Sequence, residues 1–250
     1  AAQMSLANVL AVSQAAKTVV LIGDPQQLDQ PIQGSHPDHT DVSALDHILA
    51  GEQTIPPDKG LFLEETWRLH PDICAYTSEV FYNGKLRSKA GLEKQVINAS
   101  GPINGSGLYY VPVEHDGNQN CSPEEAQAVA TLVNGILDSK ATWVDRDGQE
   151  SLVTLDDIVI ITPYNAQVFE IMQSLPGGRV GTVDKFQGQE APIAIYSTAT
   201  LSHANAPRGM EFLYSLNRLN VATSRAKCVS VLVGSPQIFE AECRTPRQIQ

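Results

Sequence analysis

The stretch VGTVDKFQGQE at residues 180–190 combines a glycine turn with a carboxylate. Its pattern predicts a short strand at 180–183 that breaks into a tight turn at Gly188, with Glu190 just beyond the turn. Glycine lets the backbone approach a phosphate closely, and a carboxylate beside it can accept hydrogen bonds from a ribose hydroxyl. These residue types and their spacing predict one side of a nucleotide-binding site.

A second stretch, LNRLNVATSRAK at residues 216–227, carries an arginine in a helical pattern. The pattern predicts a helix that presents Arg225 one turn past Val221, with small alanines on either side of the arginine. An arginine presented in this way is suited to stabilising charge on a transferring phosphoryl group. The alternative interpretation is an arginine held in a buried ion pair.

Polar residues also follow an apolar segment near the start of the chain. Helical spacing at 5–16 leads into a continuous apolar run at 18–23, which predicts a helix followed by a buried strand. In open parallel sheets, ligands bind at the carboxyl ends of the strands. Gly23, Asp24 and Gln27 are therefore candidate ligand-binding residues. A plain turn is the alternative, because Asp-Pro is a common turn former.

The following segment, residues 29–41, is rich in Pro, Gly, Asp and His and has no apolar periodicity, which predicts a loop. His36 and His39 lie near Asp38 and Asp41, a combination that invites a metal site. A solvated loop is favoured over a metal site, because such a loop usually lacks the outer hydrogen bonds that orient metal ligands.

The rest of the chain alternates between strand and helix patterns. Residues 87–107 are predicted to be irregular, and 139–150 is interpreted as a polar insertion. The remaining predicted elements are a helix at 43–49, a strand at 61–66, a helix from 71 to Asn83-Gly84, a strand at 108–114, a helix at 123–138 behind a Ser-Pro-Glu-Glu cap, a strand at 157–163, a helix at 164–175, and strands at 192–199 and 228–235. This alternation predicts an α/β fold with a doubly wound, mainly parallel sheet.

The composition limits the kind of partner that the chain can bind. The net charge is −11 over 250 residues, and 42% of the residues are hydrophobic, which is ample for a packed core. This charge balance argues against a protein that holds nucleic acid by a broad basic face. Any grip on nucleic acid must be local, through backbone amides, hydroxyls and a few basic side chains.

The cysteines and the hydropathy pattern predict a cytoplasmic protein. No apolar run reaches the roughly 18 residues that a membrane span needs, and no signal pattern is visible. The cysteines lie far apart without a CxxC pair, so buried thiols in a reducing compartment are favoured over a metal site. The four cysteines are Cys74, Cys121, Cys228 and Cys243.

Five motifs in fixed order, GDPQQL, ETWRLHP, ITPYNAQ, VGTVDKFQGQE and NVATSRAK, resemble the later motifs of superfamily 1 helicases over nearly the whole chain. The branch that they resemble most contains the RNA-surveillance helicase and the helicase-nuclease of Okazaki-fragment processing. The resemblance implies a RecA-like P-loop NTPase fold. In that family two RecA-like domains clamp ATP and Mg²⁺ between them, and single-stranded nucleic acid crosses both domains.

The resemblance implies a role for each matching residue at the nucleotide. Gln27 is similar to a γ-phosphate sensor, and Arg68 and Arg225 are similar to two arginines that reach across the cleft. Trp67 corresponds to an aromatic residue that stacks on adenine, and Glu190 to a contact of the ribose. The residues expected to bind the nucleotide are Gly23, Asp24, Trp67, Gly188 and Glu190.

Three further residues, Thr162, Tyr164 and Thr182, correspond to contacts with the nucleic-acid backbone. Simple core packing is the alternative for Tyr164, and also for Trp67. These alternatives are open at the level of the sequence.

The chain departs from the helicase pattern at its front. A helicase of this type needs a G-x-x-x-x-G-K-[ST] loop for the phosphates and an Asp-Glu pair for Mg²⁺, and the 250 residues contain neither. The opening AAQMSLAN resembles the sequence that follows that pair. We therefore expect residues 1–60 to be the C-terminal remnant of a first RecA-like domain and 61–250 to be a second one, without a P-loop of its own.

The resulting hypothesis is the C-terminal motor half of an ATP-dependent DNA helicase or translocase. Its partners would be single-stranded nucleic acid, with DNA favoured over RNA, and the upstream RecA-like domain, with no membrane contact. GLFLEETWRLHPDI and RTPRQIQ are similar to bacterial helicases fused to a RecB-like nuclease domain, which implies DNA. The alternatives are an RNA helicase or a nucleotide-gated switch that unwinds nothing, and the isolated chain is expected to be inactive.

Overall fold

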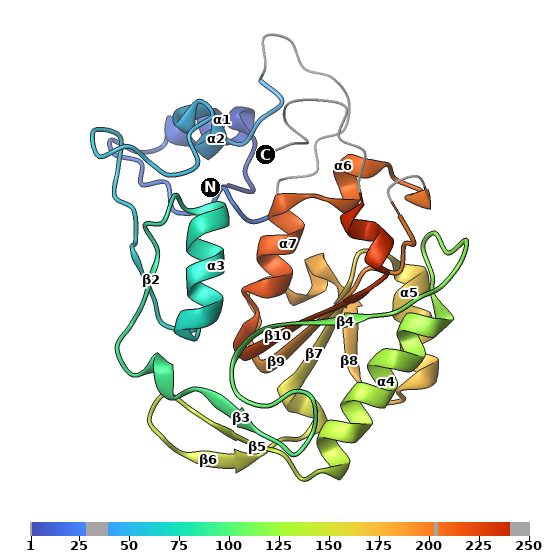
Figure 1. The fold of residues 1–250 in the computed structure, drawn as a ribbon. Coiled ribbons are helices and arrows are strands. Elements are labelled where there is room, and N and C mark those ends of the chain that lie inside the picture. Colours follow the sequence, from blue (N-terminus) through green and yellow to red (C-terminus); the bar gives the residue numbers. More distant parts are fainter. Residues whose placement is uncertain (1, 29–39, 203–204, 241–250) are drawn as a thin grey trace.

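A five-stranded parallel sheet forms the centre of the molecule (Figure 1). The computed structural model describes residues 2–28, 40–202 and 205–240. The strand order is β4-β10-β9-β7-β8, and every neighbouring pair is parallel. The strands are β4 (Gly107–Pro112), β7 (Ile158–Thr162), β8 (Arg179–Thr182), β9 (Ala191–Ser197) and β10 (Ala226–Gly234). The predicted α/β fold with a mainly parallel sheet is confirmed.

Helices cover both faces of this sheet, which explains why its central strands are continuously apolar. Helices α4 (Pro123–Asp138) and α5 (Asn165–Ser174) lie on one face, and α3 (Pro71–Phe81) and α7 (Leu216–Thr223) lie on the other (Figure 1). Along β7, Ile158 and Ile160 pack with the first pair of helices, whereas the alternate residues pack with the second pair. The sheet is therefore doubly wound, as predicted.

Local signals set the ends of the main helices. The Ser122 hydroxyl accepts a hydrogen bond from the Glu125 backbone N–H at 3.1 Å, and Pro123 occupies the first turn, so α4 begins where its cap predicts. At the end of α3, Asn83 and Gly84 both have positive φ angles, 52° and 70°, and these left-handed residues stop the helix.

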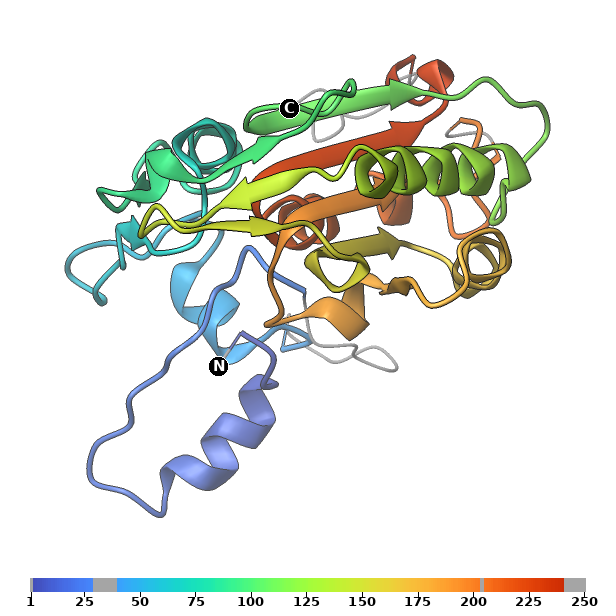
Figure 2. The same ribbon diagram turned by 90° about the horizontal axis from the view of Figure 1, so that it is seen from below.

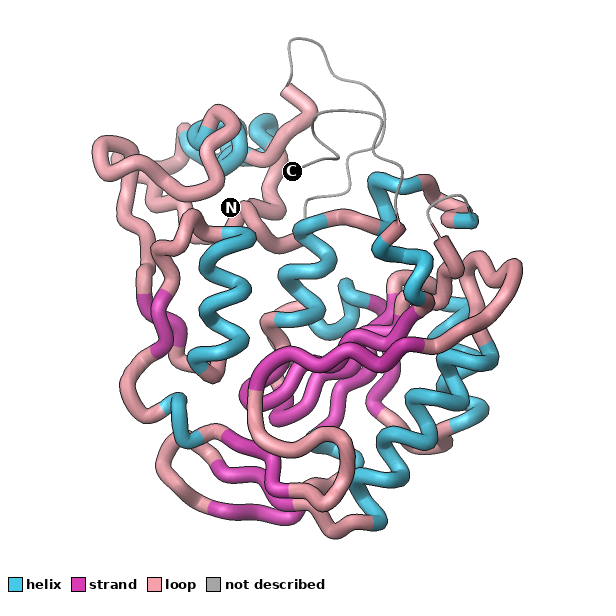
Figure 3. The backbone as a smooth tube through the Cα atoms, in the orientation of Figure 1, coloured by secondary structure: helices cyan, strands magenta, loops and turns pink. Residues whose placement is uncertain are grey.

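A second, smaller sheet lies below the first in Figure 3, where the sequence predicts none. It is antiparallel, in the order β3-β5-β6, with β3 at Val96–Asn98, β5 at Thr142–Val144 and β6 at Glu150–Leu152. The prediction that residues 87–107 are irregular was therefore wrong at β3, and the polar insertion predicted at 139–150 contributes the other two strands. Strands of three residues carry too short a pattern to recognise, and only their pairing stabilises them.

The N-terminal segment differs most from its prediction. Helix α1 (Leu6–Ser13) is shorter than the predicted 5–16 and stands away from the sheet (Figure 2), and α2 (Ala44–Leu49) follows as predicted. Residues 18–23 form no strand, and Val20 is 77% exposed. An apolar run becomes a strand only where neighbouring strands pair with it, and within the described residues none lies beside this run.

The predicted strand at 61–66 is reduced to β1 (Glu65–Thr66), which pairs in parallel with β2 (Arg87–Ser88). Leu61 and Leu63 are 92% and 79% exposed, whereas Phe62 between them packs against Tyr82 with ring centroids 5.9 Å apart, so the segment is not a buried strand. Elsewhere the cysteine prediction holds for Cys74 and Cys228, which are buried free thiols, and burial raises the pKa of Cys228 to about 12. In the described parts of the chain, the helices are too short or too polar to span a bilayer.

Candidate functional site

Arg68, Glu190 and Lys227 come together at the amino ends of β9 and β10. Arg68 Nε lies 2.7 Å from Glu190 Oε2, and Lys227 Nζ lies 2.9 Å from Glu190 Oε1. Burial opposes ionisation of this carboxyl, but the hydrogen bonds from Lys227 and Arg68 outweigh it and lower the pKa of Glu190. Glu190 is therefore an ionised carboxylate held between two cations, one of which the sequence patterns did not identify.

Arg225 lies beside this group in the turn that joins α7 to β10. The helix ends at Thr223, two residues before Arg225, so the prediction of a helical Arg225 was wrong, because the chain turns at Ser224 to enter β10. Arg225 is 2% exposed, and it donates from Nε to the Val221 carbonyl at 3.0 Å and from Nη1 to the Gln189 carbonyl at 3.2 Å. None of the ion pairs among the described residues includes Arg225.

The two arginines converge on one turn. Arg68 Nη1 donates to the Ser224 carbonyl at 3.1 Å, while Arg225 Nη2 donates to the Ser224 hydroxyl at 3.2 Å. Burial, together with the positive charge of Arg68, lowers the pKa of Arg225 to about 10. A buried guanidinium next to a second one is a place where an arriving anion is stabilised.

The GDPQQL segment reaches the same region through hydrogen bonds to α3 and α7. Asp24 Oδ2 accepts from Gln27 Nε2 at 2.9 Å and from the Tyr82 hydroxyl at 2.6 Å. Asn220 Nδ2, on α7, donates to the same hydroxyl at 3.0 Å and to the Gln26 carbonyl at 2.8 Å. Burial and the charge of Asp24 raise the pKa of Tyr82, which therefore stays a hydroxyl donor.

These bonds hold the backbone of Gln26 and Gln27 against the helix that leads to Arg225, while Gly23 is exposed at the start of the segment. Asn217, also on α7, adds a hydrogen bond to the Gln27 carbonyl at 2.6 Å. The spacing of the motif marks the segment as a turn, but its attachment to α7 depends on tertiary packing.

Trp67 and Gly188 complete the predicted nucleotide-contacting set. Trp67 is 58% exposed, which excludes the core-packing alternative, and Lys89 Nζ lies 3.4 Å from its ring centroid. Gly188 has a φ of 80°, a left-handed conformation that favours glycine, so the predicted turn is present. Trp67 and Glu190 line the same open hollow, of about 310 Å³.

The predicted nucleic-acid contacts lie at the other end of the strands. Thr162 and Thr182 are paired in register at the carboxyl ends of β7 and β8. Thr162 is fully buried, whereas Thr182 is partly exposed. Tyr164 is 6% exposed and packs against Phe212, with ring centroids 5.5 Å apart, as its core-packing alternative predicts.

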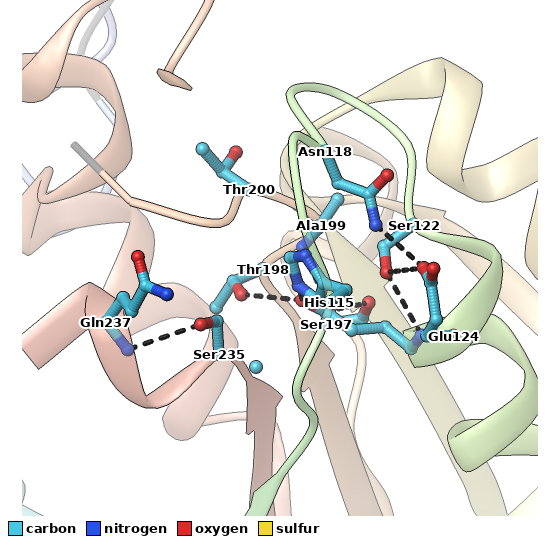
Figure 4. A network of polar contacts seen from close by, with 12 residues as sticks. His115, Asn118, Ser122, Glu124, Ser197, Thr198, Ala199, Thr200, Ser235 and Gln237 are labelled. Carbon is cyan, nitrogen blue, oxygen red and sulfur yellow. Dashed lines mark hydrogen bonds and ion pairs between the residues drawn. The ribbon is translucent and has the colours of Figure 1, made fainter. Parts of the chain in front are cut away.

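The sequence patterns did not identify a polar network that lies at the same carboxyl edge of the parallel sheet (Figure 4). Glu125 is fully buried and accepts hydrogen bonds from the Ser197 hydroxyl at 2.7 Å, the Thr198 hydroxyl at 3.1 Å and the Ala199 N–H at 2.9 Å. His115 Nε2 lies 3.1 Å from the same carboxylate. The only sequence signal was the helix cap, which does not show that Glu125 faces inward.

The loop at residues 29–41 combines histidines and aspartates in a way that invites a metal site. His36, Asp38 and His39 lie outside the described residues. Over the ranges that the structure describes, no three His, Cys, Asp or Glu side chains are grouped closely enough to hold a metal ion.

Comparison with known proteins shows a family match over most of the chain. The model of a family described as "AAA domain" matches residues 41–237. "Helicase sen1" of Schizosaccharomyces pombe is 25% identical over 96% of the chain, and "ATP-dependent helicase NAM7" of Saccharomyces cerevisiae is 27% identical over 92%. "DNA polymerase alpha-associated DNA helicase A" of S. pombe is 28% identical over 86%.

The chain spans only 14%, 24% and 33% of the lengths of these three proteins, in the order sen1, NAM7 and helicase A. A solved structure titled "The structure of PRRSV helicase" matches 86% of the chain and 29% of its own at 16% identity, with a TM-score of 0.35.

Proposed function

The chain belongs to the AAA domain family and is similar to superfamily 1 helicases over most of its length, and from this premise we propose that it is the arginine-bearing motor half of an ATP-dependent helicase or translocase. The observation that carries the proposal is the convergence of Arg68 and Arg225 on one turn beside Glu190 and Trp67. Two guanidinium groups at one point suit a triphosphate, since charge on the transferring phosphoryl group needs preorganised cations.

In the proposed cycle the two arginines change partners. Without nucleotide, Arg68 is paired with Glu190 and Arg225 with backbone carbonyls. In the closed state Arg68 and Arg225 contact the γ-phosphate, Gln27 senses it, and Glu190 turns to the ribose hydroxyls. Hydrolysis removes these contacts and the domains open again.

We propose that hydrolysis needs a phosphate-binding loop and an Asp-Glu pair that these 250 residues do not contain. We assign residues 1–60 to the first RecA-like domain and 61–250 to the second. Exposure of the apolar run at 18–23 supports this division, because such a run is buried once strands of a first domain pair with it. On its own the chain is proposed to be inactive.

Single-stranded nucleic acid is the proposed track, at the carboxyl ends of β7 and β8 near Thr162, Tyr164 and Thr182. DNA is preferred over RNA on the resemblance to bacterial helicases that carry a nuclease domain, and the cytoplasm is the proposed compartment. The names of the relatives mention both nucleic acids, as in "5'-3' DNA helicase ZGRF1" and "3'-5' exoribonuclease HELZ2" of Mus musculus.

A nucleotide-gated switch that unwinds nothing is the second candidate. The burial of Thr162 and Tyr164 favours this candidate. Among the three predicted track residues, only Thr182 is exposed enough to contact a nucleic-acid strand.

ATP hydrolysis by the protein extended upstream through its phosphate-binding loop tests these proposals. The rate is measured without nucleic acid, with single-stranded DNA and with single-stranded RNA. Stimulation by many-fold with one of the two supports the motor and identifies the track. A measurable rate that ignores both supports the switch, and no hydrolysis under any condition overturns both.

A further inference from the structure

The carboxyl end of helix α3 is tied to the GDPQQL segment by one buried hydroxyl. Tyr82 caps this end of α3 and is 8% exposed, and its ring packs against Phe62 with centroids 5.9 Å apart. Its hydroxyl donates to Asp24 Oδ2 at 2.6 Å. Burial and the negative charge of Asp24 raise the pKa of Tyr82, so the hydroxyl keeps the hydrogen that it donates. Tyr82 therefore holds this carboxylate from one side.

The same carboxylate orients the side chain of Gln27. Gln27 Nε2 donates to Asp24 Oδ2 at 2.9 Å, and the Gln26 backbone N–H donates to Asp24 Oδ1 at 3.0 Å. A carboxylate fixed by these donors and by Tyr82 holds the Gln27 amide in one orientation, and the amide nitrogen carries a second N–H that suits a phosphate oxygen. The place of Gln27 thus depends on Asp24, and the place of Asp24 depends on Tyr82.

The other side of the Tyr82 hydroxyl faces α7, which lies beside α3 on one face of the sheet (Figure 1). Asn220 is 1% exposed and donates from Nδ2 to the Tyr82 hydroxyl at 3.0 Å and to the Gln26 carbonyl at 2.8 Å. The Asn220 carbonyl accepts from the Ser224 N–H at 2.9 Å, in the turn that carries Arg225. One hydroxyl thus joins the GDPQQL segment to the last turn of α7.

These bonds cross the division proposed above between residues 1–60 and 61–250. A second tie crosses it near the same end of α3, where Lys85 Nζ donates to the Thr54 hydroxyl at 2.7 Å. Lys85 holds the loop at Thr54, whereas Tyr82 bonds to both Asp24 and Asn220. The Tyr82 hydroxyl is therefore suited to transmit a shift of one part of the chain to the other.

We propose that Tyr82 is a positioning residue, which fixes Gln27 relative to Arg225 by joining the Asp24 carboxylate to α7. This inference rests on the proposed ATP-dependent function and deepens it, since Tyr82 acts on the phosphoryl group only through Gln27. Two groups that act on one phosphoryl group must keep their separation, because a misplacement of about 1 Å can lower a rate by about 100-fold. A hydroxyl that is bonded on both sides resists such a displacement.

The test is ATP hydrolysis by Tyr82→Phe in the upstream-extended protein, with kcat and KM measured separately. The variant loses only the hydroxyl and keeps the ring that packs against Phe62. Its kcat should fall roughly 10- to 100-fold, whereas KM for ATP should stay within about two-fold, because the positioned groups act on the transition state. Asn220→Ala removes the donor on the α7 side of the hydroxyl and should lower kcat in the same way.

Combination with Gln27→Ala separates positioning from a general loss of structure. If Tyr82 acts through Gln27, Tyr82→Phe should lower kcat by less than about two-fold once residue 27 is alanine, because the effects of residues that act as a unit are not additive. A merely structural role would lower kcat by the same factor in both backgrounds.

Hydrogen exchange without nucleotide gives a readout that does not depend on turnover. The Gln26 N–H is bonded to the Asp24 side chain, and the Gln27 N–H to the Asp24 carbonyl at 3.3 Å. Tyr82→Phe should therefore speed exchange at residues 24–28 by roughly ten-fold, while exchange in the central strand β9 stays unchanged.

The matched control is Tyr110→Phe. It removes another tyrosine hydroxyl, which donates to the Gly234 carbonyl at 3.1 Å on the edge strand β4. This variant should change neither kcat nor exchange at residues 24–28.

The inference is overturned if Tyr82→Phe hydrolyses ATP at the normal rate, or if it loses the same factor of kcat in the Gln27→Ala background. Faster exchange throughout the molecule also overturns it. Failure of the proposed function looks different, because the unchanged protein then hydrolyses no ATP. In that case, faster exchange confined to residues 24–28 and α7 supports the tie through Tyr82, and unchanged exchange there overturns it.

Discussion

Arg225 and Glu190 show how burial prepares single residues for a charged ligand. Arg225 is 2% exposed, and its guanidinium is met by neutral carbonyls and a hydroxyl rather than by a carboxylate at ion-pair distance among the described residues. A buried cation of this kind is poorly compensated, so its pKa falls to about 10. An anionic phosphoryl group bound beside Arg225 offsets the cost of burying its charge, whereas bulk water does not reach the buried guanidinium.

Replacing Arg225 by alanine in the upstream-extended protein should reduce ATP turnover by about 10³- to 10⁵-fold, because an arginine that stabilises a phosphoryl transition state contributes on that scale. ADP affinity should be nearly unchanged. Steady-state hydrolysis and calorimetry measure the two effects, and a thermal melt checks that α7 still packs. Arg225→Lys keeps the charge but not the fork of donors and should recover only a small part of the rate. Near-normal turnover in the alanine variant would sink the assignment.

Glu190 makes a prediction about pH. Its folded pKa lies below the ordinary 4.5, so the ion pairs contribute stability above that value and lose it as pH falls through the folded pKa. Its side chain is 43% exposed, so Glu190→Gln should lower the free energy of unfolding by less than about 1 kcal/mol at pH 7. In urea unfolding, the difference between the variant and the unchanged chain should be smaller at pH 3 than at pH 7. The matched control is Glu65→Gln, which removes the carboxylate from another exposed ion pair, the one with Lys89. A difference that is the same at both pH values contradicts the assignment.

At the scale of elements, the start of α4 holds the end of β9. The Ser122 cap sets the helix register, and this register turns Glu125 inward, onto the hydroxyls of Ser197 and Thr198 and the backbone N–H of Ala199. Ala199 has a φ of 63°, a conformation that a side chain disfavours and that these bonds stabilise. The positive end of the helix dipole adds to the stabilisation of the carboxylate.

Glu125→Ala should therefore lower the free energy of unfolding by about 3–5 kcal/mol, because it leaves several buried donors without an acceptor. Chemical denaturation of the 250-residue chain measures the change. The adjacent Glu124 is on the outside of the same turn, where it accepts from Asn118, and Glu124→Ala should cost less than about 1 kcal/mol. Equal losses in the two variants would mean that the network does not hold the strand end.

At the scale of the whole molecule, the two candidate sites lie at opposite ends of the sheet. The arginine turn and Glu190 are at the amino ends of β9 and β10, and Thr162 and Thr182 are at the carboxyl ends of β7 and β8. The expectation that Gly23, Asp24 and Gln27 follow the carboxyl end of a strand was wrong, because residues 18–23 form no strand. The net charge of −11 means that neither site can rely on a general attraction for phosphate.

Binding of single-stranded oligonucleotides by the 250-residue chain should consequently depend only weakly on salt. If about three phosphates are contacted, the logarithm of the binding constant should fall with the logarithm of salt concentration with a slope of about −2. Fluorescence anisotropy over a salt series gives the slope. A slope steeper than about −5 would require a basic surface that the sequence does not provide.

The sequence by itself determined the features that depend on neighbours a few residues away. The cap at Ser122, the glycine turn at Gly188 and the alternation of apolar strands with helices were predicted correctly, because capping and periodicity act within one or two turns of chain. The motifs also singled out Arg68 and Arg225, whose roles at a nucleotide stay predictions.

Only the tertiary structure decided which residues meet. Arg68 and Glu190 are 122 residues apart in the chain, and Glu125 and Ser197 are 72 apart, so their contacts depend on strand order and packing that no local pattern records. The same reason explains where the structure differs from prediction: residues 18–23 are apolar but have no sheet to join in the described chain, and the polar segment at 139–150 becomes a hairpin because β3 pairs with it. A strand exists through its partner, and the choice of partner is a property of the folded molecule.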